Sequence, residues 1–473
     1  MKKILKEKNK AITLIALVIT IVILIILAGV TISLSLGNNG LFNRAKIARQ
    51  EYLNAQELEQ EKINELNARI ANGGLIPEKK NLPENTISTA AGTEVKLPDS
   101  WSTQTVRQVS LENGEDIISA TKVSTVYAVA VGNGQTIPVP YGFWYVGGNL
   151  DTGVVISDNI ADKYDGVTDK TAHSYATSLQ GNQFVWIPCT LDGANNTIKY
   201  EKRNIWEGTT QSPNTQCKGY WDMTTTGAEK EQIEKYEGFY VARYEAGLDA
   251  TITPYTGSKE WGSNVYNLNG IPQSKANKIP WSFISWENAQ KNAENMYTTS
   301  TFTQNGITKK YSDYVRSGLI TGTQWDTMIS KIGSFKNNNT PIYPLTNSSS
   351  WGNFYDNSIT FSGEASTYSN NSYQAFADIG RDSTIANGII ILKTGSSENT
   401  KAYNLYDVAG NMSEWTEEIS FYGGNTSTQY HNLRGGSCGV DGSTYGSASY
   451  RDGRSNIATT GADFGFRTVL YLK

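Results

Sequence analysis

The feature of this chain that most constrains its fold is an apolar segment near the N-terminus. Residues Ala11 to Leu36 carry no charged side chain. About 20 apolar residues suffice for a helix to cross a bilayer, so this segment predicts a transmembrane helix. Five lysines precede it, offset only by Glu7. Because an excess of Lys and Arg marks the cytoplasmic flank, we expect a single-pass protein of the cell membrane whose C-terminal part lies outside the cell.

The leader and apolar helix, KAITLIALVITIVILIILAGVTI, resemble a type IV prepilin leader of the Gram-positive kind. A cleaved secretory signal is the alternative, but it normally has a shorter apolar core and an A-x-A-like site. The resemblance implies that a prepilin peptidase cuts between Ala11 and Ile12, and that Ile12 becomes N-methylated. Ala11 replaces the family's usual Gly, and Ala16 replaces its common Glu. The resemblance therefore implies a minor or merely membrane-held pilin-like protein, with other pilin subunits as potential partners.

The rest of the chain divides into three further parts after the leader and transmembrane helix of residues 1–36. Apolar residues at steps of three and four predict a stalk helix within residues 37–74. Residues 75–136 are polar with scattered prolines, and predict a linker with a small β element at Val126–Val131. From residue 137, aromatic and β-branched runs closed by turn residues predict a folded α+β domain that extends to residue 473.

Composition narrows the classes of function. The chain has 473 residues, a hydrophobic share of 38% and a net charge of −4. Abundant aromatic residues indicate a folded chain, and the lack of a basic stripe argues against nucleic acid as a partner. The three cysteines, Cys189, Cys217 and Cys438, are too few for a disulfide framework and have no zinc-finger spacing. The sequence does not decide whether Cys189 and Cys217 form a disulfide.

Two helices are predicted within the C-terminal domain. Pro280–Tyr297 reads as a strand followed by a helix that Ser285 caps. Ser317–Ile329 repeats this pattern, with Thr323 as the N-cap and Trp325 facing inward. Polar tracts rich in Asn and Ser separate these elements and predict loops.

Several motifs follow one another in a defined order towards the C-terminus: GFYVARYEAG, YNLYDVAGNMSEWT, LRGGS, YRDGRS and DFGFR. This ordered set resembles the formylglycine-generating enzyme, or sulfatase-modifying factor, family, which is a variant of the C-type lectin fold. The resemblance covers roughly residues 138–473. It implies a loop-rich α+β domain in which Trp415 fills core. Buried arginines would hold the loops through carbonyl or carboxylate contacts, namely Arg434, Arg451 and Arg467.

The same resemblance bears on catalysis. Catalytic members of the family oxidise a substrate cysteine with a metal held by two cysteines shortly after RGGS, whereas here only Cys438 follows Ser437. One thiol does not supply paired thiolates. Related iron oxygenases of this fold need several histidines, and the chain has only His173 and His431. His431 with Cys438 is the one candidate nucleophilic pair. We therefore expect no enzymatic activity, with an exported enzyme that uses Cys438 as the alternative.

Calcium is the one cofactor that the resemblance suggests. Family members often bind calcium near the equivalent of GNMSEW, where Asn411 and Glu414 would supply oxygen ligands. A capped turn without metal explains the same residues.

The segment between LRGGS and DFGFR is dense in Tyr, Ser, Asn, Asp and Gly, a composition that antibody loops use for binding. In C-type lectin folds this region commonly faces ligand, and some bacterial and phage members have it diversified by retroelements. We expect a surface-displayed, adhesive head for an unknown protein or glycan, and a purely structural minor pilin is the alternative. The candidate ligand contacts are Asp441, Tyr445, Tyr450, Asp452 and Asn456.

Overall fold

The structure is a computed structural model that describes most of the C-terminal part of the chain. The described residues are 86–88, 94–96, 104–112, 115–123, 126–131, 135–194, 197–201, 227–250, 252, 269–304, 307–379, 383–385, 388–421, 429–443 and 446–473. The expected leader, transmembrane helix, stalk and Ala11–Ile12 cleavage site lie outside them and stay predictions. Cys217 also lies outside them, so a bridge to Cys189 is not tested. No helix within the described ranges is long and apolar enough to cross a membrane. Residues 82–304 and 308–473 form one compact unit.

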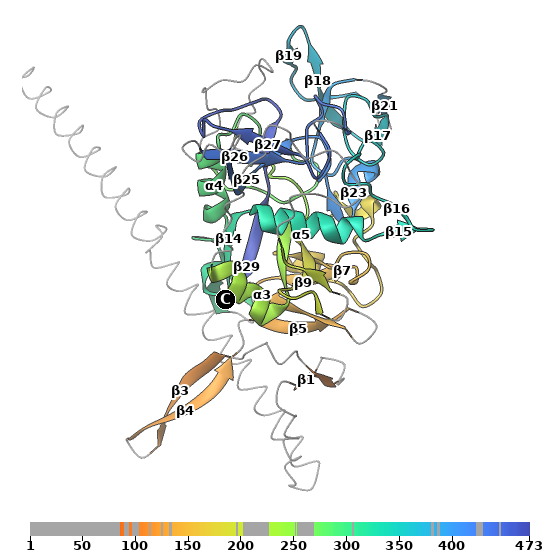
Figure 1. Ribbon diagram of the computed structural model, residues 1–473. Helices are drawn as coiled ribbons and strands as arrows, with labels where there is room; N and C mark the ends of the chain where they lie inside the picture. Colours follow the sequence, from red (N-terminus) through yellow and green to blue (C-terminus); the bar gives the residue numbers. More distant parts are fainter. Residues whose placement is uncertain are drawn as a thin grey trace, which may run out of the picture. The chain divides into compact units, whose positions relative to one another are not determined.

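A seven-stranded sheet forms the base of this unit, in the order β14-β29-β11-β9-β8-β7 with β10 beside β9 (Figure 1). The GFYVA part of the first motif forms β11, which pairs with β9 on one side and β29 on the other, and all of its residues are buried. The strands are β7 (Trp144–Gly147), β8 (Val155–Ser157), β9 (Gln183–Thr190), β10 (Ile198–Lys199), β11 (Gly238–Ala242), β14 (Val315–Leu319) and β29 (Thr468–Leu472).

A four-stranded sheet, in the order β27-β26-β25-β28, carries the C-terminal motifs. SEWT begins β25, LR ends β26, RDGR is β27 and FGF is β28, so each motif contributes a strand to the same sheet. Strand β28 pairs with β25 in parallel, and the other pairs are antiparallel. The strands are β25 (Ser413–Phe421), β26 (Gln429–Arg434), β27 (Arg451–Arg454) and β28 (Phe464–Phe466).

The remaining strands form small sheets and hairpins. Strand β5 confirms the strand expected near Val126, and it pairs with β6. Val126 is buried in a cluster of the domain core, so the packed body includes residues that precede the expected boundary at 137. The bounds are β1 (Thr86–Ser88), β2 (Glu94–Lys96), β3 (Gln104–Glu112), β4 (Glu115–Val123), β5 (Val126–Ala130), β6 (Thr136–Pro140), β12 (Thr301–Gln304), β13 (Ile307–Lys310), β15 (Lys336–Asn337), β16 (Thr340–Pro341), β17 (Ile359–Phe361), β18 (Glu364–Ser369), β19 (Ser372–Tyr373), β20 (Ala377–Asp378), β21 (Ser383–Ile385), β22 (Ile390–Leu392), β23 (Lys401–Ala402) and β24 (Leu405–Tyr406).

The described α-helices are α3 (Gly227–Tyr236), α4 (Trp286–Asn295) and α5 (Gly322–Gly333). Ser285 is the N-cap of α4, as expected. The expected N-cap of α5, Thr323, is wrong, because Thr321 takes this position. The Thr321 hydroxyl accepts from the Gln324 backbone N–H at 3.2 Å, and the Gln324 side chain accepts from the Thr321 N–H at 3.0 Å. This reciprocal capping box satisfies two of the N–H groups that a helix start leaves unpaired.

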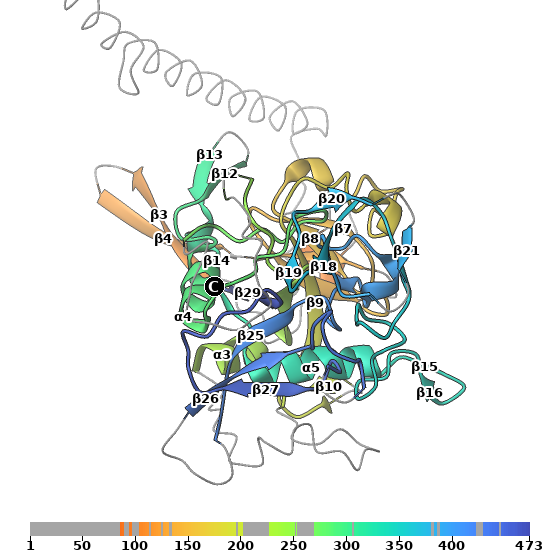
Figure 2. The same cartoon turned by 90° about the horizontal axis from the view of Figure 1, so that it is seen from above.

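Helix α5 lies between the two sheets, with β9 and β10 on one side and β25 on the other (Figure 1). Seen from above, β27 overlies the helix (Figure 2). Trp325 of α5 is fully buried, as expected, in a cluster that includes Val185 and Ile187 of β9. Trp415 is also fully buried, as expected, and its ring N–H donates to the Ile284 carbonyl. The domain is thus a β-rich fold with few helices, built around this central helix.

Candidate functional site

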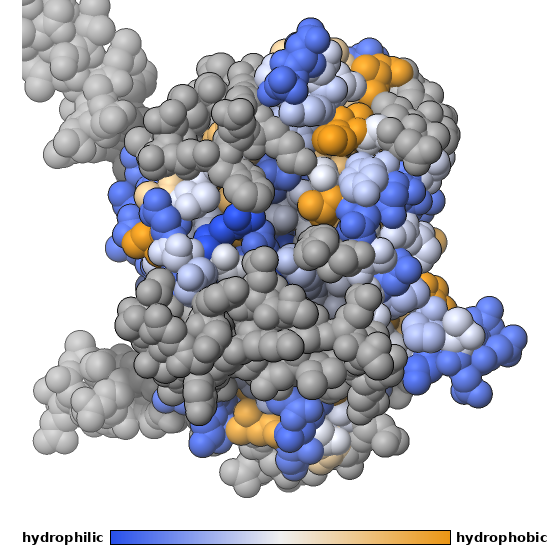
Figure 3. Space-filling model, turned by 45° about the horizontal axis from the view of Figure 1, so that its top comes forward, coloured by the Kyte–Doolittle hydropathy of each residue, from blue (hydrophilic) through white to orange (hydrophobic). Residues whose placement is uncertain are grey.

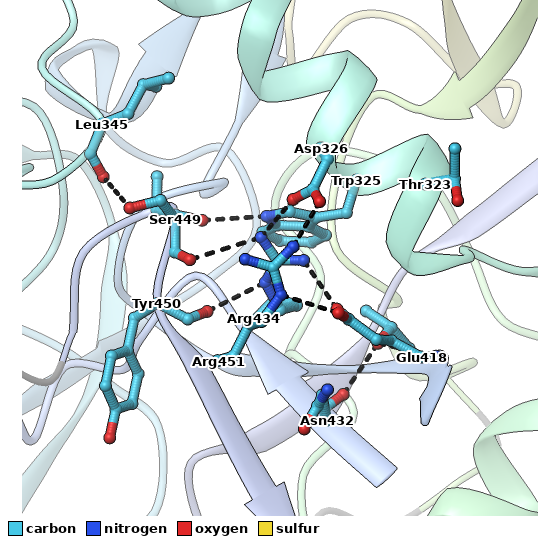
Figure 4. A network of polar contacts seen from close by, with 12 residues as sticks. Thr323, Trp325, Asp326, Leu345, Glu418, Asn432, Arg434, Ser449, Tyr450 and Arg451 are labelled. Atoms are coloured by element: carbon cyan, nitrogen blue, oxygen red, sulfur yellow. Dashed lines mark hydrogen bonds and ion pairs between the residues drawn. The ribbon is translucent and has the colours of Figure 1, made fainter. Parts of the chain in front are cut away.

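Two arginines and two acidic residues form a fully buried cluster of four charges (Figure 4). Arg434 donates to Glu418 at 2.9 Å and to Asp326 at 2.7 Å. Arg451 donates to Glu418 at 2.7 Å and also pairs with Asp326. Each charge therefore has two partners of opposite sign, and the cluster has no net charge. A cluster satisfied in this way avoids the large cost of burying an unpaired charge.

This cluster fixes the loop that follows LRGGS. Its members come from α5, β25, β26 and β27, so it joins the helix to the sheet where the loop leaves β26 and enters β27. Arg434 also donates to the Tyr450 carbonyl at 2.9 Å, and Trp325 donates to the Ala448 carbonyl at 2.9 Å. Hydrogen bonds from Arg434 and Trp325 to main-chain carbonyls therefore fix the final residues of the loop, as expected for a buried arginine.

Arg467 holds a second buried ion pair, which involves one of the expected calcium ligands. It forms two hydrogen bonds with Glu414, at 2.7 and 3.0 Å, which engage both carboxylate oxygens. The side-chain oxygen of Asn411 accepts from Asn353 and from the Leu392 N–H, both at 2.9 Å. A calcium ion would therefore have to displace these donors. Across the described residues, no cluster of three or more His, Cys, Asp or Glu could hold a metal ion.

Cys438 and His431, the candidate nucleophilic pair, have different neighbours. The Cys438 thiol is fully buried and lies 3.4 Å from the Tyr373 hydroxyl. His431 lies on strand β26, and its ring centroid is 3.9 Å from that of Trp286. Burial lowers the pKa of His431 to about 4, so the imidazole is neutral at physiological pH. His173 contacts the Tyr406 hydroxyl through Nδ1, at 3.4 Å.

Two hollows on the domain surface share one lining residue, Tyr343. The first has a volume of about 350 Å³ and the second about 260 Å³. Tyr343 lines both. The first is also lined by Ile198, Ser330, Gly333, Ser334, Lys336, Pro341, Pro344, Leu345 and Thr346. The second is also lined by Asp151, Thr152, Phe335, Ile342, Glu398, Lys401, Tyr403 and Asn404.

The first hollow borders the loop that follows LRGGS. The carbonyl of Leu345 accepts hydrogen bonds from the Ser449 N–H at 3.1 Å and from the Ser449 hydroxyl at 2.9 Å. One wall of this hollow is thus attached to the end of the loop in which we expected ligand contacts. Sequence reasoning missed both hollows, because their walls come from segments far apart in the chain and from no recognisable motif.

The expected ligand contacts are held mainly by local interactions. The carboxylate of Asp441 accepts from Ser443, and Asn456 accepts from the N–H two residues further on. Asp452 forms an ion pair with an arginine of its own strand, β27. The half-buried Tyr450 side chain points away from the four-charge cluster (Figure 4). Tyr445 lies outside the described residues. None of the four described candidates lines either hollow.

Comparisons with known proteins give one family. A family model for a sulfatase-modifying factor enzyme 1-like domain matches residues 218–472. The crystal structure of CarF is similar to this chain at 16% sequence identity, with a TM-score of 0.27, over 50% of this chain and 87% of CarF. No curated protein matches the chain.

Proposed function

The chain belongs to the family of sulfatase-modifying factor enzyme 1-like domains, and from this premise we propose that it is a binding protein displayed at the cell surface. In this proposal the family domain is a non-catalytic, adhesive head, and the apolar segment at residues 11–36 tethers it to the membrane. The prepilin-like leader makes prepilin peptidase and other pilin subunits its candidate partners. The head would face outwards because the flanking lysines stay in the cytoplasm.

The observation that carries the proposal is the pair of hollows that share Tyr343, the first of which lies beside the end of the loop that follows LRGGS. Ligand sites are typically concave, with apolar and aromatic walls and a few placed polar groups. The first hollow has this composition, whereas the second combines aromatic residues with several charged and polar ones. The Leu345–Ser449 hydrogen bonds attach the first hollow to the loop. A loop rich in Gly and Ser with two tyrosines, next to a preformed hollow, is an arrangement that suits a binding surface.

The environment of Cys438 supports a head without redox catalysis. Reactive cysteines are partly exposed and lie in electropositive surroundings that stabilise the thiolate. Cys438 is fully buried against Tyr373, and no second cysteine follows Ser437 in the sequence. The alternative of an exported enzyme requires this thiol to become accessible.

The test uses the full chain with a C-terminal epitope, expressed in a Gram-positive host. Protease added to intact cells should remove the epitope, and the mature N-terminus should be a methylated Ile12. Cells that display the chain should attach to at least one coating of purified cell wall, mucin or collagen. Replacement of both Tyr445 and Tyr450 by Ala should weaken this attachment without loss of the epitope.

Three outcomes would contradict the proposal. An epitope that protease reaches only after lysis would refute the orientation, and cells that attach to none of the coatings would refute the binding role. Oxidation of a cysteine-containing peptide by the purified full chain, lost in Cys438→Ser, would favour the exported enzyme. An intact Met1 would remove the pilin-like processing but leave a plain signal-anchor.

A further inference from the structure

We propose that the two hollows form one site for an uncharged oligosaccharide chain, with the Tyr343 ring between two successive sugar units. The inference rests on the proposed binding role and names the ligand class and the residues that would bind it. Tyr343 is the lining residue that the two hollows share, so a ligand that occupies both would contact it. A linear ligand with repeating units fits this arrangement.

Tyr343 is held rigidly in place. Its ring packs edge-on against Trp351, with centroids 5.5 Å apart and planes at 70°. Trp351 is itself only 3% exposed, and its ring N–H donates to the Pro344 carbonyl at 2.9 Å. The half-buried tyrosine therefore offers a preformed apolar surface next to a hydroxyl, which lowers the entropy lost on binding. An amphipathic ring of this kind matches a sugar, whose C–H faces and hydroxyl edges alternate.

The charges of the second hollow compensate one another. The Lys401 amine and the Glu398 carboxylate are 3.3 Å apart. Burial lowers the pKa of Lys331, and the nearby negative charge of Asp151 raises it again in part. These two opposite charges therefore also attract each other. Lys331 lies over the Tyr403 ring at 5.1 Å. Among the described residues that line this hollow two are acids and one is a lysine, so an anion would meet repulsion, whereas a neutral hydroxyl could use the donor of Lys401 and the acceptor of Glu398 together.

Two serine hydroxyl groups in the first hollow already donate their hydrogen atoms to main-chain carbonyls. Ser330 donates to the Asp326 carbonyl at 2.6 Å, and Ser334 donates to the Lys331 carbonyl at 2.7 Å. The oxygen lone pairs of both serines can still accept, which suits the hydroxyl donors of a sugar. Among the described residues, Lys336 is the charged one that lines this hollow. Its amine can donate to a sugar hydroxyl.

The surface fits a narrow polar ligand better than a protein partner. On the face shown in Figure 3, apolar residues form separate spots among polar ones. Ile342, at 48% exposure, is the one strongly exposed large apolar side chain that lines either hollow. A stable protein interface buries about 800 Å² on each partner around an apolar centre, whereas the apolar residues drawn in colour on this face (Figure 3) are scattered.

The test measures binding of three neutral hexasaccharides, namely maltohexaose, cellohexaose and chitohexaose, to the full chain in detergent micelles by calorimetry. Saturable binding of at least one is expected. Tyr343→Ala should weaken it by about tenfold or more, as for the loss of a central aromatic contact, whereas Tyr343→Phe should retain most of it. Ser334→Trp, at an exposed position, should block the first hollow without removing any core contact. Tyr355→Ala is the matched control, because Tyr355 is 42% exposed and lines neither hollow.

The proposal is overturned if none of the hexasaccharides binds, if Tyr343→Ala and Ser334→Trp both bind like wild type, or if a charged hexasaccharide or an unrelated peptide binds more tightly. These results are separable from failure of the proposed function. Displaying cells that still attach to a coating, while the Tyr343 and Ser334 variants attach equally well, would keep the binding role and place its site elsewhere. Cells that attach to nothing would refute the binding role itself.

Discussion

Replacement of Glu418 by Gln tests whether the buried four-charge cluster stabilises the loop that borders the proposed site. Glu418 accepts from Arg434 at 2.9 Å and from Arg451 at 2.7 Å, and all three side chains are fully buried. The substitution keeps the shape of the side chain but leaves two arginines with only the charge of Asp326. The cluster then carries one uncompensated positive charge that water cannot reach.

The magnitude follows from this geometry. Loss of one partner of a buried ion pair typically costs about 3–5 kcal/mol. The amide oxygen of Gln can still accept from one of the arginines, which returns about 1 kcal/mol. We therefore expect the free energy of unfolding to fall by about 2–4 kcal/mol, a large part of the 5–15 kcal/mol typical of a domain. Adding Arg451→Gln restores neutrality, so the double variant should lose less than the sum of the two single losses.

The measurement is guanidinium unfolding of the full chain in detergent, followed by tryptophan fluorescence. The matched control is Glu234→Gln, which removes an exposed i,i+4 pair with Lys230 at 3.6 Å and should cost no more than about 0.5 kcal/mol. A loss below about 1 kcal/mol for Glu418→Gln would refute the reasoning. So would full additivity in the double variant, because the two charges would then not be coupled.

Three further predictions concern α5 and α3. Gly322→Ala should destabilise the domain by about 1–3 kcal/mol in the same unfolding assay, because an added Cβ would lie 2.8 Å from the side chain of Glu418; a neutral result would mean that Glu418 moves freely. Thr321→Ala should cost about 1 kcal/mol and Thr321→Ser much less, since the hydroxyl caps α5; equal losses would contradict the capping role. Burial raises the pKa of Glu229 from 4.5 to about 7, so the folded state binds the proton more tightly and stability should fall as the pH rises from about 4.5 through 7. Glu229→Gln should flatten this dependence in unfolding curves at pH 5 to 8, and an unchanged slope would assign it to another group.

Local sequence patterns identified much of the fold. The helix at Trp286–Asn295 with its Ser285 cap was predictable because the cap and the buried stripe lie within a few residues of each other. The burial of Trp415, in contrast, was expected from the family resemblance and not from a local pattern. The T-x-x-Q pattern at Thr321 was also present in the sequence. It gives the correct cap for α5, whereas a hydroxyl at Thr323 lies too far into the first turn to receive the capping N–H groups.

The partners of the buried charges could not be predicted in the same way. The sequence favours buried arginines in LRGGS and YRDGRS, but no neighbouring residue identifies the acidic side chains that pair with them. Arg434 pairs with Asp326, 108 residues earlier in the chain, on a different element. Asn411 and Glu414 illustrate the reverse case: the family resemblance suggests them as oxygen ligands, whereas the fold brings Arg467 and Asn353 to those same oxygens.

The sequence by itself determined the classes of structure in this protein: an uncharged N-terminal segment long enough for a bilayer, a domain of one family with both strands and helices, and a single cysteine after LRGGS. These conclusions need only local composition and order. Only the tertiary structure showed that Cys438 is buried in contact with Tyr373 and that Tyr343 lines two hollows. The physical reason is that burial and concavity depend on which distant segments pack together, and the walls around Tyr343 come from residues between Asp151 and Asn404 that no local pattern connects.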